Sequence, residues 1–248
     1  MSALPGQSVE NYRKTLETVL SLKPQHISAY SLIVEEGTPF YEKYGQESEK
    51  LQATGEKQPD LPSEEEEREM YALTEKLLAA AGYHRYEISN YALPGRECRH
   101  NLVYWKRGNY VGFGLGAASM VENVRFENTR KMQEYLAEYA GAPKAEEVFA
   151  EVTQGDAQQI FQGENVHPLS PQEQMEETMF LGLRLTEGVS KAEFQRQFGV
   201  SMEQIYGEVI WENTAKGLLI EEAGNVRLTW EGMDLSNYVM AQFLLDED

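Results

Sequence analysis

The chain has 248 residues, of which 41% are hydrophobic, so it can bury one large core or two smaller ones. Its net charge of −19 works against polyanionic partners such as nucleic acid and anionic lipid. No run approaches the roughly 20 apolar residues of a transmembrane segment, and no pattern marks a secretory signal, so we predict a cytoplasmic protein. The single cysteine, Cys98, excludes an internal disulfide and a cysteine-rich metal site.

The first part of the chain alternates helical and strand-like patterns. After a first helix closed by a proline, residues 26–34 are short, apolar and β-prone, which is typical of an αβ step in a β/α barrel. Residues 47–67 are polar and predict a loop. A helix over 64–81 and a strand over 85–89 are predicted next, because a capping box and helical spacing are followed by a glycine.

Before the second part, the periodic spacing of apolar residues is lost in a stretch rich in Gly, Pro, Gln and acidic residues, which predicts a linker over 141–168. His167 is interpreted as a surface residue of this linker. Residues 169–248 are regular, with three capped helices, a hairpin around Gly224-Asn225 and a closing helix over 230–245. This order is typical of a mainly α, winged-helix-like domain.

Winged helices often bind DNA, but the acidic character of this one argues against it. The expected recognition helix, residues 202–216, carries Glu203, Glu208 and Glu212 against only Lys216. Phosphate contacts are therefore disfavoured, and we predict a packing or lid role instead of nucleic-acid binding.

Candidate functional residues concentrate in a His-Asn-x-x-Tyr-Trp cluster formed by His100, Asn101, Tyr104 and Trp105. Neutral imidazole is a usual ligand of heme iron, so His100 is the first candidate for an axial ligand. The two aromatic rings could stack on a porphyrin, and the amide could bind a propionate or set the imidazole tautomer. From the residues alone, core packing and turn capping are favoured over heme binding by about two to one.

A local basic patch surrounds this cluster in an otherwise acidic chain. Arg96, Arg99, Lys106 and Arg107 lie within twelve residues and could meet the propionates of a tetrapyrrole. The alternative is that they pair with carboxylates of the chain itself. The glycine-rich run at 112–116 lacks the spacing of a dinucleotide-binding fingerprint and is by itself a weak signal.

Three stretches of the sequence carry a family resemblance. Tyr86-Glu-Ile-Ser-Asn-Tyr-Ala92, Arg99-His-Asn-Leu-Val-Tyr-Trp105 and Gly112-Phe-Gly-Leu-Gly-Ala117 closely resemble the radical-SAM family of oxygen-independent coproporphyrinogen III oxidases, and within it the heme-chaperone branch HemW. The resemblance covers nearly the whole chain. It implies an α/β fold, with the C-terminal part of an incomplete radical-SAM β/α barrel over 1–140 and a HemN-type C-terminal domain over 169–248.

The resemblance also implies cofactors that this chain does not supply. Members carry a Cys-x-x-x-Cys-x-x-Cys loop for a [4Fe-4S] cluster that cleaves S-adenosylmethionine, whereas this sequence holds only Cys98 and therefore lacks iron–sulfur ligands. Where the family usually has a histidine after the glycine run, this chain has Ala118. We expect the N-terminal cluster-binding part to be missing, the chain to be catalytically silent, with no catalytic residues, and the open barrel to self-associate.

Three functions follow from the resemblance and the residues. In the first, the chain is the C-terminal portion of a HemW-like protein that binds heme and delivers it to acceptor proteins, with His100, Asn101, Tyr104 and Trp105 at the heme. In the second, it is a fragment of the oxidase that decarboxylates coproporphyrinogen III. In the third, it is a scaffold whose acidic C-terminal domain docks another protein. The His-Asn-x-x-Tyr-Trp motif favours the first.

Overall fold

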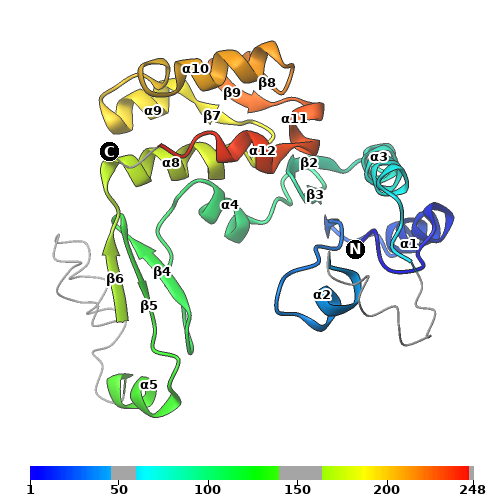
Figure 1. Ribbon diagram of the computed structural model, residues 1–248, viewed down its shortest axis with the longest axis horizontal. Coiled ribbons are helices and arrows are strands. Elements are labelled where there is room, and N and C mark those ends of the chain that lie inside the picture. Colours follow the sequence, from blue (N-terminus) through cyan, green and yellow to red (C-terminus); the bar gives the residue numbers. More distant parts are fainter. Residues whose placement is uncertain (46–59, 140–163, 246–248) are drawn as a thin grey trace. The chain divides into compact units, whose positions relative to one another are not determined.

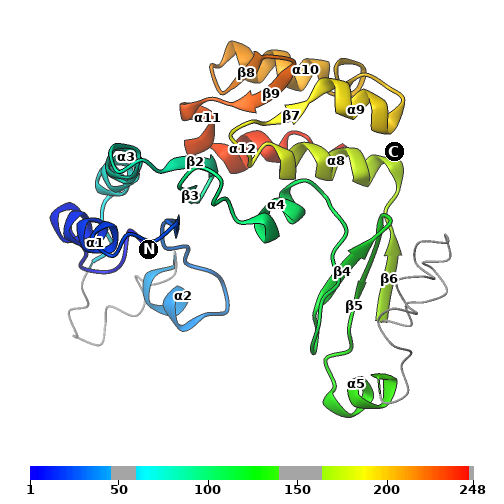
Figure 2. The same cartoon turned by 180° about the vertical axis from the view of Figure 1, so that it is seen from behind.

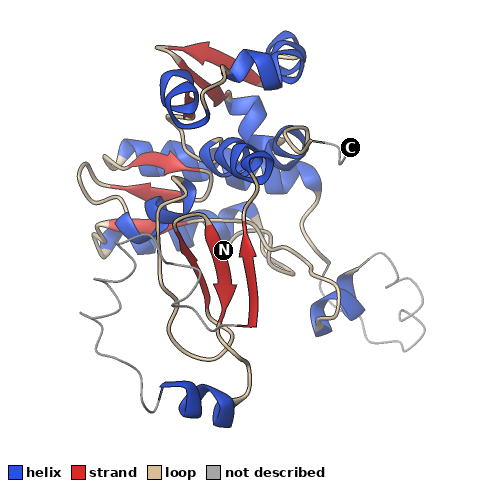
Figure 3. Ribbon diagram, turned by 90° about the vertical axis from the view of Figure 1, so that its left-hand side faces the viewer, coloured by secondary structure: helices blue, strands red, loops and turns tan. Residues whose placement is uncertain are grey.

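The computed structural model describes residues 1–45, 60–139 and 164–245. The chain divides into two compact units, Met1–Cys98 and Arg99–Asp248. Helices and strands alternate in both, so the fold is mixed α and β (Figure 1). Within the described residues the strands form three separate three-stranded sheets, drawn in red in Figure 3. In these parts of the chain, no helix is long and apolar enough to cross a bilayer.

The first unit is built on two helices that pack against each other. Ser8 caps the first helix as its hydroxyl accepts from the N–H of Asn11, and a capping box at Ser63 opens the long helix. The Tyr12 hydroxyl is 2.8 Å from the Thr74 hydroxyl inside this contact. The elements are α1 (Val9–Ser21), β1 (His26–Ser28), α2 (Pro39–Tyr44), α3 (Glu64–Ala80), β2 (His84–Glu87) and β3 (Asn90–Ala92).

The sheet of this unit is antiparallel. Its strand order is β1-β3-β2, and both pairings of β3 run antiparallel. A short turn joins β2 to β3, which favours the antiparallel direction for that pair. Among the described residues of this unit, Ser2 and Ser31 form an isolated bridge that is parallel. The incomplete β/α barrel predicted for residues 1–140 is therefore not confirmed by the strand pairing. The strand expected over 26–34 is shorter than predicted and ends at Ser28.

The second unit starts with α4 (Arg99–Trp105) and continues into an antiparallel sheet of order β4-β5-β6. In Figures 1 and 2 these three strands lie side by side, with α5 (Met132–Tyr139) at one end of the sheet. The strands are β4 (Ala118–Val121), β5 (Val124–Glu127) and β6 (Glu164–Pro168). Residues 164–168, which the sequence assigned to a linker, thus extend this sheet. The rest of that predicted linker, 141–163, lies outside the described residues.

The C-terminal part of this unit contains the predicted capped helices. Capping boxes open α8 and α10, and the hydroxyl of Ser190 caps α9. The predicted hairpin is present, and β7 adds a third strand to it in the order β7-β9-β8. The elements are α8 (Pro171–Gly182), β7 (Val189–Ser190), α9 (Lys191–Phe198), α10 (Met202–Ala215), β8 (Leu219–Glu222), β9 (Asn225–Leu228), α11 (Trp230–Asp234) and α12 (Ser236–Ala241).

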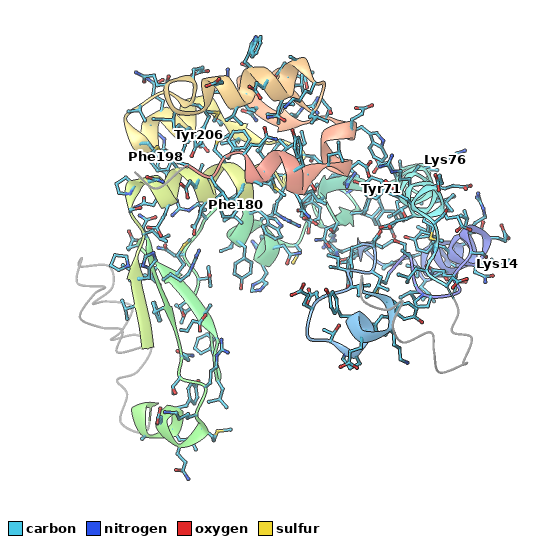
Figure 4. All side chains as sticks on the ribbon, viewed as in Figure 1. Lys14, Tyr71, Lys76, Phe180, Phe198 and Tyr206 are labelled. Atoms are coloured by element: carbon cyan, nitrogen blue, oxygen red, sulfur yellow. The ribbon has the colours of Figure 1, made fainter. Side chains whose placement is uncertain are left out.

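Buried aromatic rings hold these C-terminal helices together. Tyr206 of α10 is fully buried, and its ring centroid lies 5.2 Å from that of Phe243 and 6.1 Å from that of Phe194. Figure 4 shows Tyr206 on the inner side of α10, between this helix and α12. The closing helix predicted over 230–245 is instead two short helices, because Leu235 leaves the helical conformation at φ −105° and ψ 27°.

An exposed carboxylate at the start of α8 yields a pH prediction. His167 Nε2 lies 2.6 Å from Glu173 Oε1, and the Ser170 N–H donates to the other oxygen; these bonds lower the pKa of Glu173 to about 2. Because the folded pKa is depressed, this contribution to stability is present above pH of about 4.3 and is lost as the pH falls towards 2. We expect an NMR titration to place the Glu173 midpoint near 2, and to find a higher midpoint in His167→Ala. An unchanged midpoint in the variant would contradict this cause.

Candidate functional site

The predicted motif forms the short helix α4, none of whose side chains is buried. His100 is exposed and Tyr104 is partly exposed. Residues four apart lie on one face of a helix, so the imidazole and the phenol meet. Their ring centroids are 4.9 Å apart with an interplanar angle of 89°, an edge-to-face contact.

A third ring, Tyr110, continues this stack. Its centroid lies 4.6 Å from that of Tyr104 at an interplanar angle of 65°. The backbone of Tyr110 is fixed because it exchanges hydrogen bonds of 2.8 and 2.9 Å with Met120 of β4. We call His100, Tyr104 and Tyr110 the aromatic ladder. The sequence pattern does not indicate Tyr110 as a site residue, because only the return of the chain along β4 brings it to α4.

The polar atoms of His100 are open to a ligand. Within the described part of the chain, neither ring nitrogen of His100 has a hydrogen bond or ion pair, and the Asn101 amide has none either. An imidazole whose nitrogens have no protein partner can coordinate a metal ion without first breaking a bond. In the same described residues, no three His, Cys, Asp or Glu side chains gather as a metal-binding cluster.

Trp105 occupies a different environment from His100. The Arg184 guanidinium carbon lies 4.3 Å from the centroid of the indole ring, a cation–π distance that covers one ring face. The indole N–H is buried and has no acceptor among the residues that the structure describes. The structure thus brings His100 and Tyr104 together but orients Trp105 towards the C-terminal helices.

The basic patch is divided between two roles. Lys106 Nζ lies 2.8 Å from Glu187 Oε1, and Arg107 Nε lies 3.0 Å from Glu177 Oε2. These two cations therefore pair with the chain's own carboxylates, the alternative that the sequence left open. Arg96 and Arg99 are exposed and form no ion pair across the described ranges.

The glycine-rich run at 112–116 is a loop that side-chain hydrogen bonds hold in place, and its apolar side chains are exposed. The Asn128 side-chain amide donates to the carbonyls of Gly112 and Gly114, and the Gly112 N–H donates to the Ser119 hydroxyl. A Cβ on Gly112 would lie 2.3 Å from the Ala118 carbonyl oxygen, so only glycine fits there. Ala118, the residue after the run and Ala117, starts β4.

Comparison with known proteins indicates which proteins this chain resembles. The model of the HemN C-terminal domain matches residues 169–235. The heme chaperone HemW of Lactococcus lactis is 36% identical over 99% of this chain, and that of Bacillus subtilis is 36% identical over 98%. These matches support the HemW branch of the family for this chain. It spans 57% of the length of each of these two HemW proteins, so the alignment covers a little over half of either relative.

A solved structure agrees with this family in fold. The chain is similar to coproporphyrinogen III oxidase HemN from Escherichia coli, which is described as a radical-SAM enzyme, with a TM-score of 0.66 over 98% of this chain and 53% of that one. At 16% identity the likeness shows the fold alone. The mixed α and β fold of this chain is thereby supported over almost its whole length.

Proposed function

We propose that this chain binds heme, with His100 as an axial ligand of the iron. The observation that carries the proposal is the exposed imidazole, whose two nitrogens have no hydrogen-bond partner within the described residues and whose ring is held edge-on by Tyr104 at 4.9 Å. An open neutral imidazole is the donor that heme iron accepts in many proteins. The relatives named heme chaperones add support for a heme ligand.

The neighbouring side chains suit the other parts of a heme. The rings of Tyr104 and Tyr110 supply an apolar surface beside the iron ligand. Asn101, one residue after His100, can donate its amide to a propionate, and the exposed guanidinium of Arg99 can add a charge-assisted bond. In this proposal Trp105 does not stack on the macrocycle, because Arg184 already covers one face of its indole.

Delivery of heme to acceptor proteins belongs to the same proposal and concerns the longer protein that the HemW relatives represent. A three-cysteine cluster loop cannot be assembled from this sequence, whose only cysteine is Cys98. We therefore propose no cleavage of S-adenosylmethionine by these 248 residues on their own. Oxidative decarboxylation of coproporphyrinogen III is not proposed either, since the likeness to HemN carries the fold and not the activity.

Titration with hemin tests the proposal. We expect the wild-type chain to shift the hemin Soret band saturably, and His100→Ala to bind at least about tenfold more weakly with an altered band, because the iron ligand is lost. His167→Ala is the matched control, since His167 is an exposed histidine of the same unit outside α4. Equal titrations of wild type and His100→Ala would remove His100 from the site. Equal losses in both variants would show nonspecific binding by surface histidines.

A further inference from the structure

The end of α4 is attached to the C-terminal domain through three consecutive residues. Trp105 lies under the Arg184 guanidinium at 4.3 Å, Lys106 Nζ is 2.8 Å from Glu187, and Arg107 Nε is 3.0 Å from Glu177. We call these three contacts the clamp. Its partner residues lie on α8 or shortly after it, inside the segment that matches the HemN C-terminal domain. Figures 1 and 2 both show α4 beside α8.

The centre of the clamp is a buried ion pair. The side chains of Arg107 and Glu177 are only 4% and 8% exposed. The second oxygen of Glu177 is 2.9 Å from Arg125 of β5, so both oxygens of the carboxylate are bound. In a buried pair of this kind, loss of one partner leaves the other charge without compensation, so the arrangement resists reorientation. The pair on Lys106 is largely exposed and contributes little by comparison.

The backbone at Arg107 shows how the clamp fixes the helix. Arg107 adopts a left-handed conformation with φ of 51°, unusual for a residue other than glycine, and its N–H bonds the Tyr104 carbonyl at 3.1 Å. Its guanidinium also donates to the Asn123 side chain at 3.0 Å. Arg107 therefore forms the turn that ends α4, and its position is set by the bond to Glu177. The orientation of α4 depends on that position.

We propose that Glu177 is a positioning residue for heme binding: through the clamp, the HemN C-terminal domain sets the orientation of α4 and so the direction of the His100 imidazole. The inference rests on the proposed function of His100. Glu177 does not touch the ligand in this scheme. It acts through Arg107, whose turn ends the helix that bears His100 and Tyr104. The C-terminal domain is then a part of the binding site's framework and not a separate appendage.

The test compares hemin binding by Glu177→Gln and Arg125→Gln. Glutamine keeps the shape of the side chain but removes the charge that holds Arg107, so we expect about tenfold weaker hemin binding and a Soret band displaced towards that of His100→Ala. Arg125→Gln removes the other arginine from the same carboxylate. Because Arg125 comes from β5 and its side chain is 40% exposed, its loss leaves the buried pair of Arg107 and Glu177 in place, and this variant is expected to bind and absorb as the wild type does.

Two further variants separate positioning from lost stability. Leu228→Ala opens a fully buried position of β9 away from the clamp, and we expect it to lower thermal stability without displacing the Soret band of bound hemin. Should Glu177→Gln fail to fold, Arg184→Gln takes its place, since it removes the contact with Trp105 without leaving a buried carboxylate. Wild-type binding and spectrum in the folded clamp variant would overturn the inference while leaving the role of His100 intact. If His100→Ala also binds hemin as the wild type does, the proposed role of His100 is itself wrong, and the inference about Glu177 has no basis.

Discussion

Replacing Gly232 by alanine is expected to lower the free energy of unfolding by about 3 kcal/mol, the upper part of the usual range for overpacking. A Cβ at this position in α11 would lie 1.9 Å from the carbonyl oxygen of Leu218 and 3.2 Å from a methyl group of Leu228. The carbonyl cannot easily move away, because it accepts a hydrogen bond from the Thr229 N–H. Urea unfolding of the chain, followed by circular dichroism, measures the loss.

Gly207→Ala is the matched control for this prediction. Gly207 also lies inside a helix of the same domain, α10, but an added Cβ there meets only the Glu203 side chain, at 4.0 Å. Because alanine is a better helix former, we expect stability to rise by about 0.5–1 kcal/mol. A fall in both variants of similar size would show that the close approach of Leu218 does not limit position 232.

Truncating Phe243 to alanine is expected to cost about 3–5 kcal/mol of unfolding free energy, the usual range for a buried phenylalanine. The side chain has no exposed surface, and its ring packs at 5.2 Å from that of Tyr206. The cavity would lie between α10 and the residues that follow α12. Thermal unfolding of Phe243→Ala against wild type measures the cost, and a change under about 1 kcal/mol would show that the site collapses or is solvated in solution.

Tyr206 is the ring that packs against Phe243, and Tyr206→Phe is expected to raise the free energy of unfolding. The Tyr206 hydroxyl is buried and has no hydrogen-bond partner among the described residues. Folding therefore removes it from water without replacing its hydrogen bonds, and removing the hydroxyl removes that free-energy cost. Burial raises the pKa of Tyr206, with the Glu176 charge adding to the shift. Because the folded pKa is raised, stability should fall as the pH rises above about 10, where the unfolded phenol ionises. This alkaline loss should be smaller in Tyr206→Phe.

Helix starts in this protein were predictable because their causes are local. Serines at positions 8, 63, 170 and 201 each accept a hydrogen bond from a backbone N–H three residues on, as the pattern predicts. The hairpin around Gly224-Asn225 was predictable for the same reason, since Ala223 and Gly224 both take positive φ in a tight turn. Sequence patterns succeed where a few neighbouring residues decide the conformation.

Strand pairing and the break in the closing helix were not predictable from such patterns. The stretch at 26–34 is apolar enough for a strand in a parallel barrel, yet β1 pairs antiparallel with β3, a partner more than 60 residues away. The closing helix bends at Leu235 while Gly232 packs tightly against Leu218 and Phe243 reaches Tyr206. Both outcomes depend on contacts between distant residues, which local propensity does not encode.

The sequence by itself determined which side chains can carry the chemistry: a motif with one imidazole beside aromatic rings, at a spacing that places His100 and Tyr104 on one helix face, and a single cysteine. Only the tertiary structure decided which of them are exposed and which are paired within the chain. It added Tyr110 to the aromatic ladder, placed Trp105 under Arg184, and took Lys106 and Arg107 into ion pairs with the C-terminal domain. The physical reason is that burial and charge pairing are settled by residues brought together from some 70 positions away in the chain, as for Arg107 and Glu177.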